Sequence, residues 1–257
     1  GQNYQVVNSF ILITSNVKTV ACGPSHTFII KNDNTLWGTG RNLSGQLGTG
    51  NYSGTYSFTK IDSNVKAVAC GGNYTLIIKN DDMLWGAGGN KDYQLGTGTY
   101  FFDTNLFIPI VSGIKAVACV GTSTFIISND NTLWVVGKNS SGNLGTGNTF
   151  NQTSFTLVES NVKAIACGGS STFIIKNDDT LWATGANDYG QLGIGNYNNK
   201  LSFTLVESNV KAVACGSRHA IIIKKDNTLW VSGDNSDGQL GIGTNIIKTN
   251  QFIKITY

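Results

Sequence analysis

Histidine and charged residues are scarce in this sequence, which limits the classes of function that the protein can have. Only His26 and His219 can supply an imidazole among the 257 residues. The sequence shows neither a nucleophile with a base nor paired carboxylates with metal ligands above the background expected by chance. We therefore predict that the protein is not an enzyme, with no catalytic residues, no metal and no cofactor.

Charged residues make up 13% of the chain, about half the usual share, and the net charge is only +3. Lysine recurs singly at one repeat position, which predicts a ring of solvated strand ends and not a stripe that follows phosphates. These residues are Lys18, Lys66, Lys115, Lys163 and Lys211. No apolar run is long enough to cross a membrane. The composition predicts neither nucleic-acid binding nor membrane insertion.

What the chain has in abundance is repetition, with a period of 48 or 49 residues. Each repeat has a cysteine that is followed 15 residues later by a tryptophan, so insertions inside the repeat are almost absent. The markers are Cys22, Cys70, Cys119, Cys167 and Cys215, with Trp37, Trp85, Trp134, Trp182 and Trp230. Such a period indicates a solenoid, an array or a propeller. We predict a single repeat domain over residues 1–257, with repeats at about 15–62, 63–111, 112–159, 160–207 and 208–257.

Each repeat contains four candidate strands. In the second repeat they cover residues 65–70, 75–79, 83–85 and 106–110, separated by glycine-rich and Asn/Asp turns. The second strand carries adjacent apolar residues, so both faces of its sheet need cover, and no segment has the periodicity of a covering helix. Only the sheet of the next repeat can supply that cover. We therefore predict an all-β fold: a β-propeller of four-stranded antiparallel blades, with five repeats of about 48 residues.

The glycine-rich loop carries a family signature. Residues 40–50, GRNLSGQLGTG, resemble the G-x-N-x-x-G-Q-L-G-x-G signature of the regulator-of-chromosome-condensation (RCC-type) repeat family, and residues 21–27 join the match. The resemblance covers about residues 15–257 and implies a propeller. The functions of the family range from nucleotide exchange on a small GTPase to enzyme inhibition, and fold alone does not choose between them. No Gly-Lys-Ser/Thr follows the loop, so we interpret its glycines as turn residues and not as a nucleotide site.

The number of repeats departs from the family pattern, since propellers of this family usually have seven blades. The sequence leaves open whether five repeats close into a ring or form part of a longer array. Residues 8–13 resemble the outer-strand segment that contains Phe58, so residues 1–14 are predicted to hold an extra N-terminal strand. A spare edge strand can pair with a neighbouring molecule, and self-association is therefore a hypothesis.

The cysteines and the surface composition point to different compartments. Equivalent positions in successive blades are seldom within disulfide distance, which favours buried thiols and a reducing compartment. A ring of thiols that binds a soft metal is the alternative, but the paired spacings of zinc sites are absent. A weakly charged surface rich in Asn, Thr and Ser is instead typical of secreted proteins, although residues 1–16 do not read as a signal peptide. Localisation is left open between the cytoplasm and the cell exterior.

The two histidines occupy one repeat position, which favours a structural role in a turn. The other three repeats carry Tyr74, Ser123 and Ser171 at this position. In a closed five-bladed ring the first and fifth repeats are neighbours, so His26 would approach His219. Arg218 precedes His219, which makes this seam the best candidate site for a small ligand.

The segments that follow Gly-Thr-Gly or Gly-Ile-Gly differ most between repeats and are rich in Asn and aromatic residues. Tyr and Phe on polar loops supply contact area at low entropic cost, as interface anchors do. We predict a non-enzymatic scaffold that binds a protein partner through these loops. The alternatives are a surface-assembly protein that self-associates through terminal strands and a multivalent glycan-binding propeller. The predicted partner-binding residues are Tyr52, Tyr56, Tyr93, Tyr100, Phe101, Phe102, Phe150, Tyr189, Tyr197, Arg218 and His219.

Overall fold

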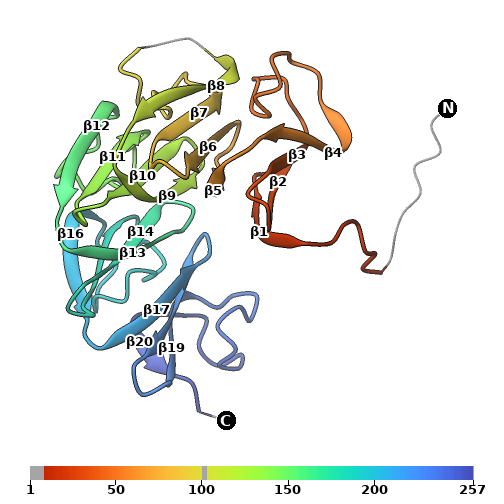
Figure 1. The fold of residues 1–257 in the computed structure, drawn as a ribbon. Helices are drawn as coiled ribbons and strands as arrows, with labels where there is room; N and C mark the ends of the chain where they lie inside the picture. Colours follow the sequence, from red (N-terminus) through yellow and green to blue (C-terminus); the bar gives the residue numbers. More distant parts are fainter. Residues whose placement is uncertain (1–8, 100–102, 257) are drawn as a thin grey trace.

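The computed structural model describes residues 9–99 and 103–256. These residues contain strands and no helix, and hence no helix that could span a membrane. The strands form five antiparallel sheets of four strands each, and across every sheet the strands lie in chain order. Figure 1 shows the sheets as successive blades around an arc. The predicted all-β propeller with five four-stranded blades is confirmed.

Every blade is built from one repeat, and the strand bounds recur with the repeat. Blade 1 has β1 (Val17–Cys22), β2 (His26–Lys31), β3 (Leu36–Gly40) and β4 (Thr55–Asp62). Blade 2 has β5 (Val65–Cys70), β6 (Tyr74–Lys79), β7 (Leu84–Gly88) and β8 (Thr104–Val111), and blade 3 has β9 (Ile114–Val120), β10 (Ser123–Ser128), β11 (Leu133–Gly137) and β12 (Gln152–Glu159). Blade 4 has β13 (Val162–Cys167), β14 (Ser171–Lys176), β15 (Leu181–Gly185) and β16 (Lys200–Glu207), and blade 5 has β17 (Val210–Cys215), β18 (His219–Lys224), β19 (Leu229–Asp234) and β20 (Lys248–Lys254).

The second and third strands of each blade form a hairpin whose turn contains an Asn or Asp with positive φ. In blade 2 this residue is Asp82, with φ 64°. Asp81 Oδ1 accepts a hydrogen bond from Met83 N at 3.1 Å, and Lys79 N donates to Met83 O at 3.0 Å. Asn and Asp tolerate the left-handed conformation and bond nearby backbone groups, so the hairpin forms where the sequence predicts it.

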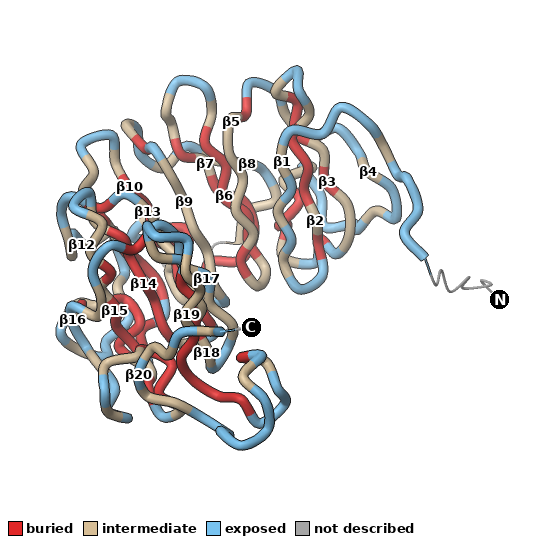
Figure 2. The backbone as a smooth tube through the Cα atoms, turned by 90° about the horizontal axis from the view of Figure 1, so that it is seen from below, coloured by how far each residue is buried: buried red, intermediate tan, exposed pale blue. Residues whose placement is uncertain are grey.

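Each pair of consecutive blades shares a hydrophobic core, as strands that are apolar on both faces require. Phe28, Ile30 and Leu47 of blade 1 are buried against blade 2, which contributes Val65 and Ile77. Equivalent side chains build the cores between blades 2 and 3, blades 3 and 4, and blades 4 and 5. Figure 2 shows that burial is concentrated in the middle strands of the blades. Adjacent blades therefore stabilise one another across their faces.

The asparagine of the G-x-N sequence organises each glycine-rich loop. In blade 3 the buried Asn139 donates through Nδ2 to Thr146 Oγ1 at 3.0 Å and to Asn148 O at 2.9 Å. Its Oδ1 accepts a hydrogen bond from Leu144 N at 2.9 Å. The corresponding Oδ1 bonds are made by Asn42, Asn90, Asn187 and Asn235. Because loop amides are already bonded inside the protein, the loop acts as a closed turn and not as an anion cradle.

The arc of blades is open between blade 5 and blade 1. Figures 1 and 2 show these two blades apart, and the described residues form four inter-blade cores, whereas a closed ring of five blades has five. Val17 at the start of blade 1 is 37% exposed, while Val65 at the same position in blade 2 is 0% exposed. The five blades therefore do not close into a ring, which the sequence had left undecided.

The extra N-terminal strand expected over residues 8–13 does not form in the part of it that the structure describes. Residues 9–14 belong to no strand, and Phe10, Leu12 and Ile13 are exposed. This segment resembles an outer strand, which pairs with the third strand of a blade. All five third strands already have their own outer strand, so no matching edge is left for this segment.

Candidate functional site

Four of the predicted loop residues present aromatic rings to solvent. Tyr56 and Phe150 are the most exposed of them, at 97% and 75%, and Tyr52 and Tyr197 are partly exposed. Apart from Tyr56, which is the second residue of β4, these residues lie in the segment between the third and fourth strands of a blade. Because blades repeat, equivalent loops lie on the same face of the propeller. The structure thus places exposed aromatic rings on the predicted face in blades 1, 3 and 4.

Other predicted residues contribute less exposed surface or lie outside the described part of the chain. Tyr100, Phe101 and Phe102 lie outside the described residues. Tyr93 is half-buried and has φ 62°, at the position where blade 1 has Gly45 with φ 82°. This tyrosine therefore adopts the left-handed turn conformation of the glycine that it replaces.

Phe150 stands on a loop whose backbone is held at several points. Asn139 Nδ2 donates to Phe150 O at 3.2 Å, and Phe150 N donates to Asn148 Oδ1 at 2.9 Å. The same loop is tied to blade 4 by an isolated bridge between Thr146 and Ser202. An exposed ring on a fixed backbone loses little conformational entropy when it binds, which is the property of an interface anchor.

Two cations from blade 5 lie over tyrosine rings of blade 4. Arg218 Cζ is 4.4 Å from the centroid of the Tyr189 ring, and Lys248 Nζ is 4.4 Å from the centroid of the Tyr197 ring. Each cation is attracted by the negative face of its ring, at about 0.5–1 kcal/mol for an exposed pair. The structure therefore brings together the predicted residues Tyr189 and Arg218. The sequence analysis did not predict Lys248, although its place at the end of a variable loop could have indicated it.

The predicted seam between His26 and His219 is wrong. His26 is buried, and its Nε2 lies 3.0 Å from Thr75 Oγ1 of blade 2. His219 is half-buried and begins β18 of blade 5, and blade 5 lies at the other end of the arc from blade 1, so the two imidazoles do not meet. The expectation required blades 1 and 5 to be neighbours, and the open arc separates them. Burial lowers the pKa of His26 to about 4, which makes it a neutral structural residue near pH 7.

The cysteines are free and lie on the first strand of each blade, with Cys22 exposed and the others half-buried. Burial raises the pKa of Cys70, Cys119 and Cys215 to about 12, so these thiols stay protonated near pH 7. A protonated thiol is a poor nucleophile and a poor metal ligand. Within residues 9–99 and 103–256, no group of three or more His, Cys, Asp or Glu side chains is placed to hold a metal ion.

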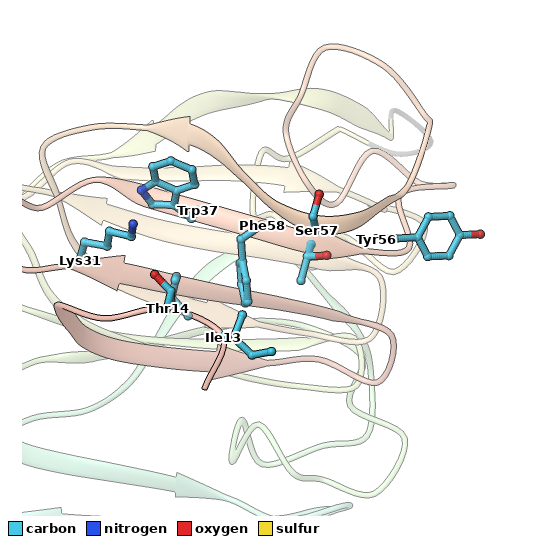
Figure 3. A pocket seen from close by; sticks show the side chains of 9 residues that line it. Ile13, Thr14, Lys31, Trp37, Tyr56, Ser57 and Phe58 are labelled. Carbon is cyan, nitrogen blue, oxygen red and sulfur yellow. The ribbon is translucent and has the colours of Figure 1, made fainter. Parts of the chain in front are cut away.

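The free face of blade 1 contains a cavity of about 540 Å³ that sequence reasoning did not predict. Figure 3 shows its wall, with Trp37 and Phe58 from blade 1 and Ile13 from the N-terminal segment. Lys31 Nζ lies 4.4 Å from the centroid of the Trp37 ring. In Figure 3 the ring of Tyr56 points away from the other lining residues. The repeat itself could have indicated this cavity. The residues of blade 2 that are equivalent to its wall pack against blade 1.

The repeats match a known family in sequence. Two forms of the Regulator of chromosome condensation (RCC1) repeat match the chain, one at residues 17–46, 65–94, 162–191 and 210–239 and the other at residues 130–175 and 178–223. These matches cover more than half of the 257 residues. The chain belongs to the RCC1-repeat family. The resemblance in the loop signature is thus confirmed, and the first of these RCC1 matches begins with β1.

Solved structures of RCC1-type propellers share the fold, whereas no curated protein matches the sequence. Human WBSCR16 superposes with a TM-score of 0.83 and 20% identity, over 93% of this chain and 66% of that chain. Prp20p from Saccharomyces cerevisiae superposes with a TM-score of 0.81 and 18% identity, over 94% of this chain and 63% of that chain. Yeast RCC1 (Prp20), in a structure with Kap60, superposes with a TM-score of 0.73 and 18% identity, over 94% of this chain and 75% of that chain. This RCC1-repeat chain therefore spans just under two thirds of the first two structures.

Proposed function

We propose that this RCC1-repeat propeller is a non-enzymatic scaffold that binds a protein partner through the loops of one face. Among the similar structures, Prp20p is described with its binding to Gsp1p and histones, and yeast RCC1 (Prp20) is bound to Kap60. Propellers of the same fold thus bind proteins, which supports the choice of a protein partner. Fold alone does not decide function, so the proposal depends on the loop residues themselves.

The observation that carries the proposal is the exposed ring of Phe150 on a fixed loop backbone, in the blade that precedes the one with the Tyr197 loop. Phe150 is held by the bonds of its loop to Asn139 and Asn148. Tyr197 is held under Lys248. Exposed aromatic residues on a rigid frame are enriched in protein interfaces, where they account for a large share of the binding energy.

The charges around these rings indicate what kind of partner fits. Lys248 and Arg218 are exposed and lie over tyrosine rings of the neighbouring blade. The surface formed by Phe150, Tyr197, Tyr189 and these two cations, which we call the loop surface, thus combines apolar contact area with positive charge. A partner that presents apolar side chains flanked by carboxylates is complementary to it.

The test is a double substitution, Phe150→Ser with Tyr197→Ser, compared with the control Leu157→Ser. Leu157 is 52% exposed on β12, so the control removes a similarly exposed apolar side chain away from the loops. Partners are captured from extracts of the organism with the wild-type protein and identified, and their dissociation constants are then measured. We expect the double variant to bind at least about tenfold more weakly, and the control to bind as the wild type does. Equal binding by both variants would remove the loop surface from the proposal.

A further inference from the structure

A lysine covers a tryptophan ring at the same place in four of the five blades. The lysine is the last residue of the second strand, and the tryptophan is the second residue of the third strand. Each Nζ lies between 4.3 and 4.5 Å from the centroid of the ring, in the pairs Lys31 with Trp37, Lys79 with Trp85, Lys176 with Trp182 and Lys224 with Trp230. In these blades the face of the ring therefore holds an alkylammonium group.

At three of the four interfaces between blades the same ammonium also forms an ion pair. Its partner is the carboxylate of the last residue of the outer strand in the preceding blade. The Nζ–O distances are 3.0, 2.8 and 2.9 Å, for the pairs Lys79–Asp62, Lys176–Glu159 and Lys224–Glu207. Each of these interfaces thus supplies a cation for the ring and a carboxylate for the cation.

The interface between blades 2 and 3 has neither member of this ion pair. Ser128 ends β10 in place of the lysine, and Val111 ends β8 in place of the carboxylate. Trp134 is nevertheless held as the other rings are, because its Nε1 donates to Thr132 Oγ1 at 2.9 Å and the indoles of blades 1, 4 and 5 make the equivalent bond. Over residues 9–99 and 103–256, no lysine or arginine lies over this ring.

A cavity of about 280 Å³ lies beside Trp134, where the side chain of Ser128 is much shorter than the lysine of the other blades. Its other walls are apolar and come from Val111, Ile114, Ile126 and Phe155. Blades 2 and 3 each have a neighbouring blade on both faces, so the cavity is an internal feature of the arc (Figure 1). Sites for whole small molecules have volumes of about 300–1,000 Å³, so this cavity suits a head group or the end of a side chain.

The rim of the cavity carries a negative charge. Asp130 and Ser128 both line the cavity, and Ser128 Oγ donates a hydrogen bond to Asp130 Oδ1. Thr132 N donates to the same oxygen at 3.0 Å. These bonds, first of all that of Ser128, lower the pKa of Asp130, so the carboxylate is charged near pH 7. A ring face and a carboxylate at one cavity favour a cationic occupant.

The missing outer-strand carboxylate favours a quaternary ammonium over a primary one. A primary ammonium has three N–H donors, and over three of the other rings a carboxylate accepts one of them. Val111 cannot accept a hydrogen bond, so a primary ammonium here would lose that bond in a partly buried place. A trimethylammonium has no N–H to satisfy. Its methyl groups can contact the apolar walls while the Trp134 ring attracts its charge.

We propose that this cavity, which we call the Trp134 site, binds a trimethylammonium head group, from a choline-type small molecule or from a trimethylated lysine side chain. The head group takes the place over Trp134 that the lysine ammonium takes over the other four rings. Val111 and Ile114 contact its methyl groups, and Asp130 supplies negative charge at the rim. The Trp134 site lies at the start of β11 and the loop that carries Phe150 follows its end, so this site is separate from the loop surface.

The experiment follows the tryptophan indole N–H signals by NMR in the 257-residue protein labelled with nitrogen-15, with Trp134→Phe to assign the signal of Trp134. The probes are choline, its neutral isostere 3,3-dimethylbutan-1-ol, and ethanolamine, whose ammonium is primary. We expect choline to shift the Trp134 signal to saturation. The isostere lacks the charge and ethanolamine lacks the methyl groups, so both are expected to bind at least about tenfold more weakly.

Two double variants use residues that the chain already places at equivalent interfaces, so both are expected to fold, which thermal unfolding checks. Ser128→Lys with Val111→Glu introduces the ion pair of the other interfaces, and its own lysine should cover Trp134 and weaken choline binding at least about tenfold. Lys176→Ser with Glu159→Val uncovers Trp182 in blade 4 and should add a second choline site there. The control is Phe150→Ser with Tyr197→Ser, which should bind choline as the wild type does.

The origin of the head group is tested with a short peptide that contains trimethyllysine. Binding at least about tenfold tighter than that of choline would indicate a methylated protein, and the reverse would indicate a small molecule. Equal affinities would mean that the site recognises the head group alone. Because the control variant separates the Trp134 site from the loop surface, either proposal can fail without the other.

Three results would overturn the proposal. The first is the absence of a saturable shift of the Trp134 signal with both choline and the trimethyllysine peptide. The second is equal binding of choline and its neutral isostere, because the site would then recognise shape and not charge. The third is undiminished choline binding by Ser128→Lys with Val111→Glu, which would place the bound choline elsewhere on the protein.

Discussion

Acidification should destabilise the fold through one buried side chain, His26. Its ring is 2% exposed, its Nε2 lies 3.0 Å from Thr75 Oγ1, and its Nδ1 is buried without a hydrogen-bond partner. Burial disfavours the imidazolium and lowers the pKa from 6.5 to about 4, against a smaller opposing effect of the Tyr74 backbone. The folded protein therefore resists the proton that the unfolded chain accepts.

The sign and the pH window follow from these two values. Above about pH 6.5 the imidazole is neutral in both the folded and the unfolded state, so it does not lower the free energy of unfolding. Between about pH 6.5 and pH 4 the unfolded state binds a proton that the folded state does not, so the free energy of unfolding falls as pH falls. A tenfold change in proton affinity corresponds to about 1.4 kcal/mol, so the full loss is on the order of 3 kcal/mol.

The assay is urea unfolding of the wild type and of His26→Ser at pH 7, 5.5 and 4.5. Serine occupies the same repeat position in blades 3 and 4, as Ser123 and Ser171, so it suits the local backbone. The variant loses some packing at every pH, but the difference in stability between the two proteins should shrink as the pH falls. His219→Ser is the matched control, since its ring is only half-buried at the end of the arc. A constant difference between wild type and His26→Ser from pH 7 to 4.5 would refute the reasoning.

Three further predictions concern blade packing, the loops and ligand class. Gly193→Ala should cost about 2–4 kcal/mol, because φ is +68° and the new Cβ would lie 2.4 Å from Phe252 Cδ2. Gly241→Ala, with φ +67° and nothing within 4 Å, should cost only about 1 kcal/mol in the single chain, and equal losses in thermal unfolding would contradict the packing argument. Asn139→Ala should cost about 2–4 kcal/mol in urea unfolding, because it leaves the buried Leu144 N–H unpaired. The glycan-binding alternative predicts specific binding on a glycan array, and a blank array would eliminate it.

The blades could be predicted from the sequence because their determinants are local or periodic. The fixed step from cysteine to tryptophan sets the register, and the Asn/Asp turn before Met83 fixes a hairpin within a few residues. Apolar residues on both faces of strands such as β6 require a sheet on each side, whatever the details of the packing. The described part of the predicted N-terminal strand, residues 9–14, forms no strand, for a different reason. Its sequence suits an outer strand, but a strand also needs a free partner, which local sequence does not show.

The candidate site could be predicted only as single residues. The loop composition pointed to Phe150 and Tyr197, and both are exposed. The pairing of Tyr197 with Lys248, and of Tyr189 with Arg218, was not visible, because each pair joins two blades. The cavity beside blade 1 was also missed, since its apolar residues are those that every other blade buries.

By itself the sequence determined the repeat, the four strands of each blade, the stacking of blade on blade and the self-closed glycine loops. Only the tertiary structure decided that five blades form an open arc, and therefore which copies of a repeated residue are covered. His26 and His219 share a repeat position, yet the first is buried against Thr75 and the second lies at a free end. The physical reason is that the angle between blades is set by side-chain packing at each interface, summed over four interfaces, and no local pattern encodes that sum.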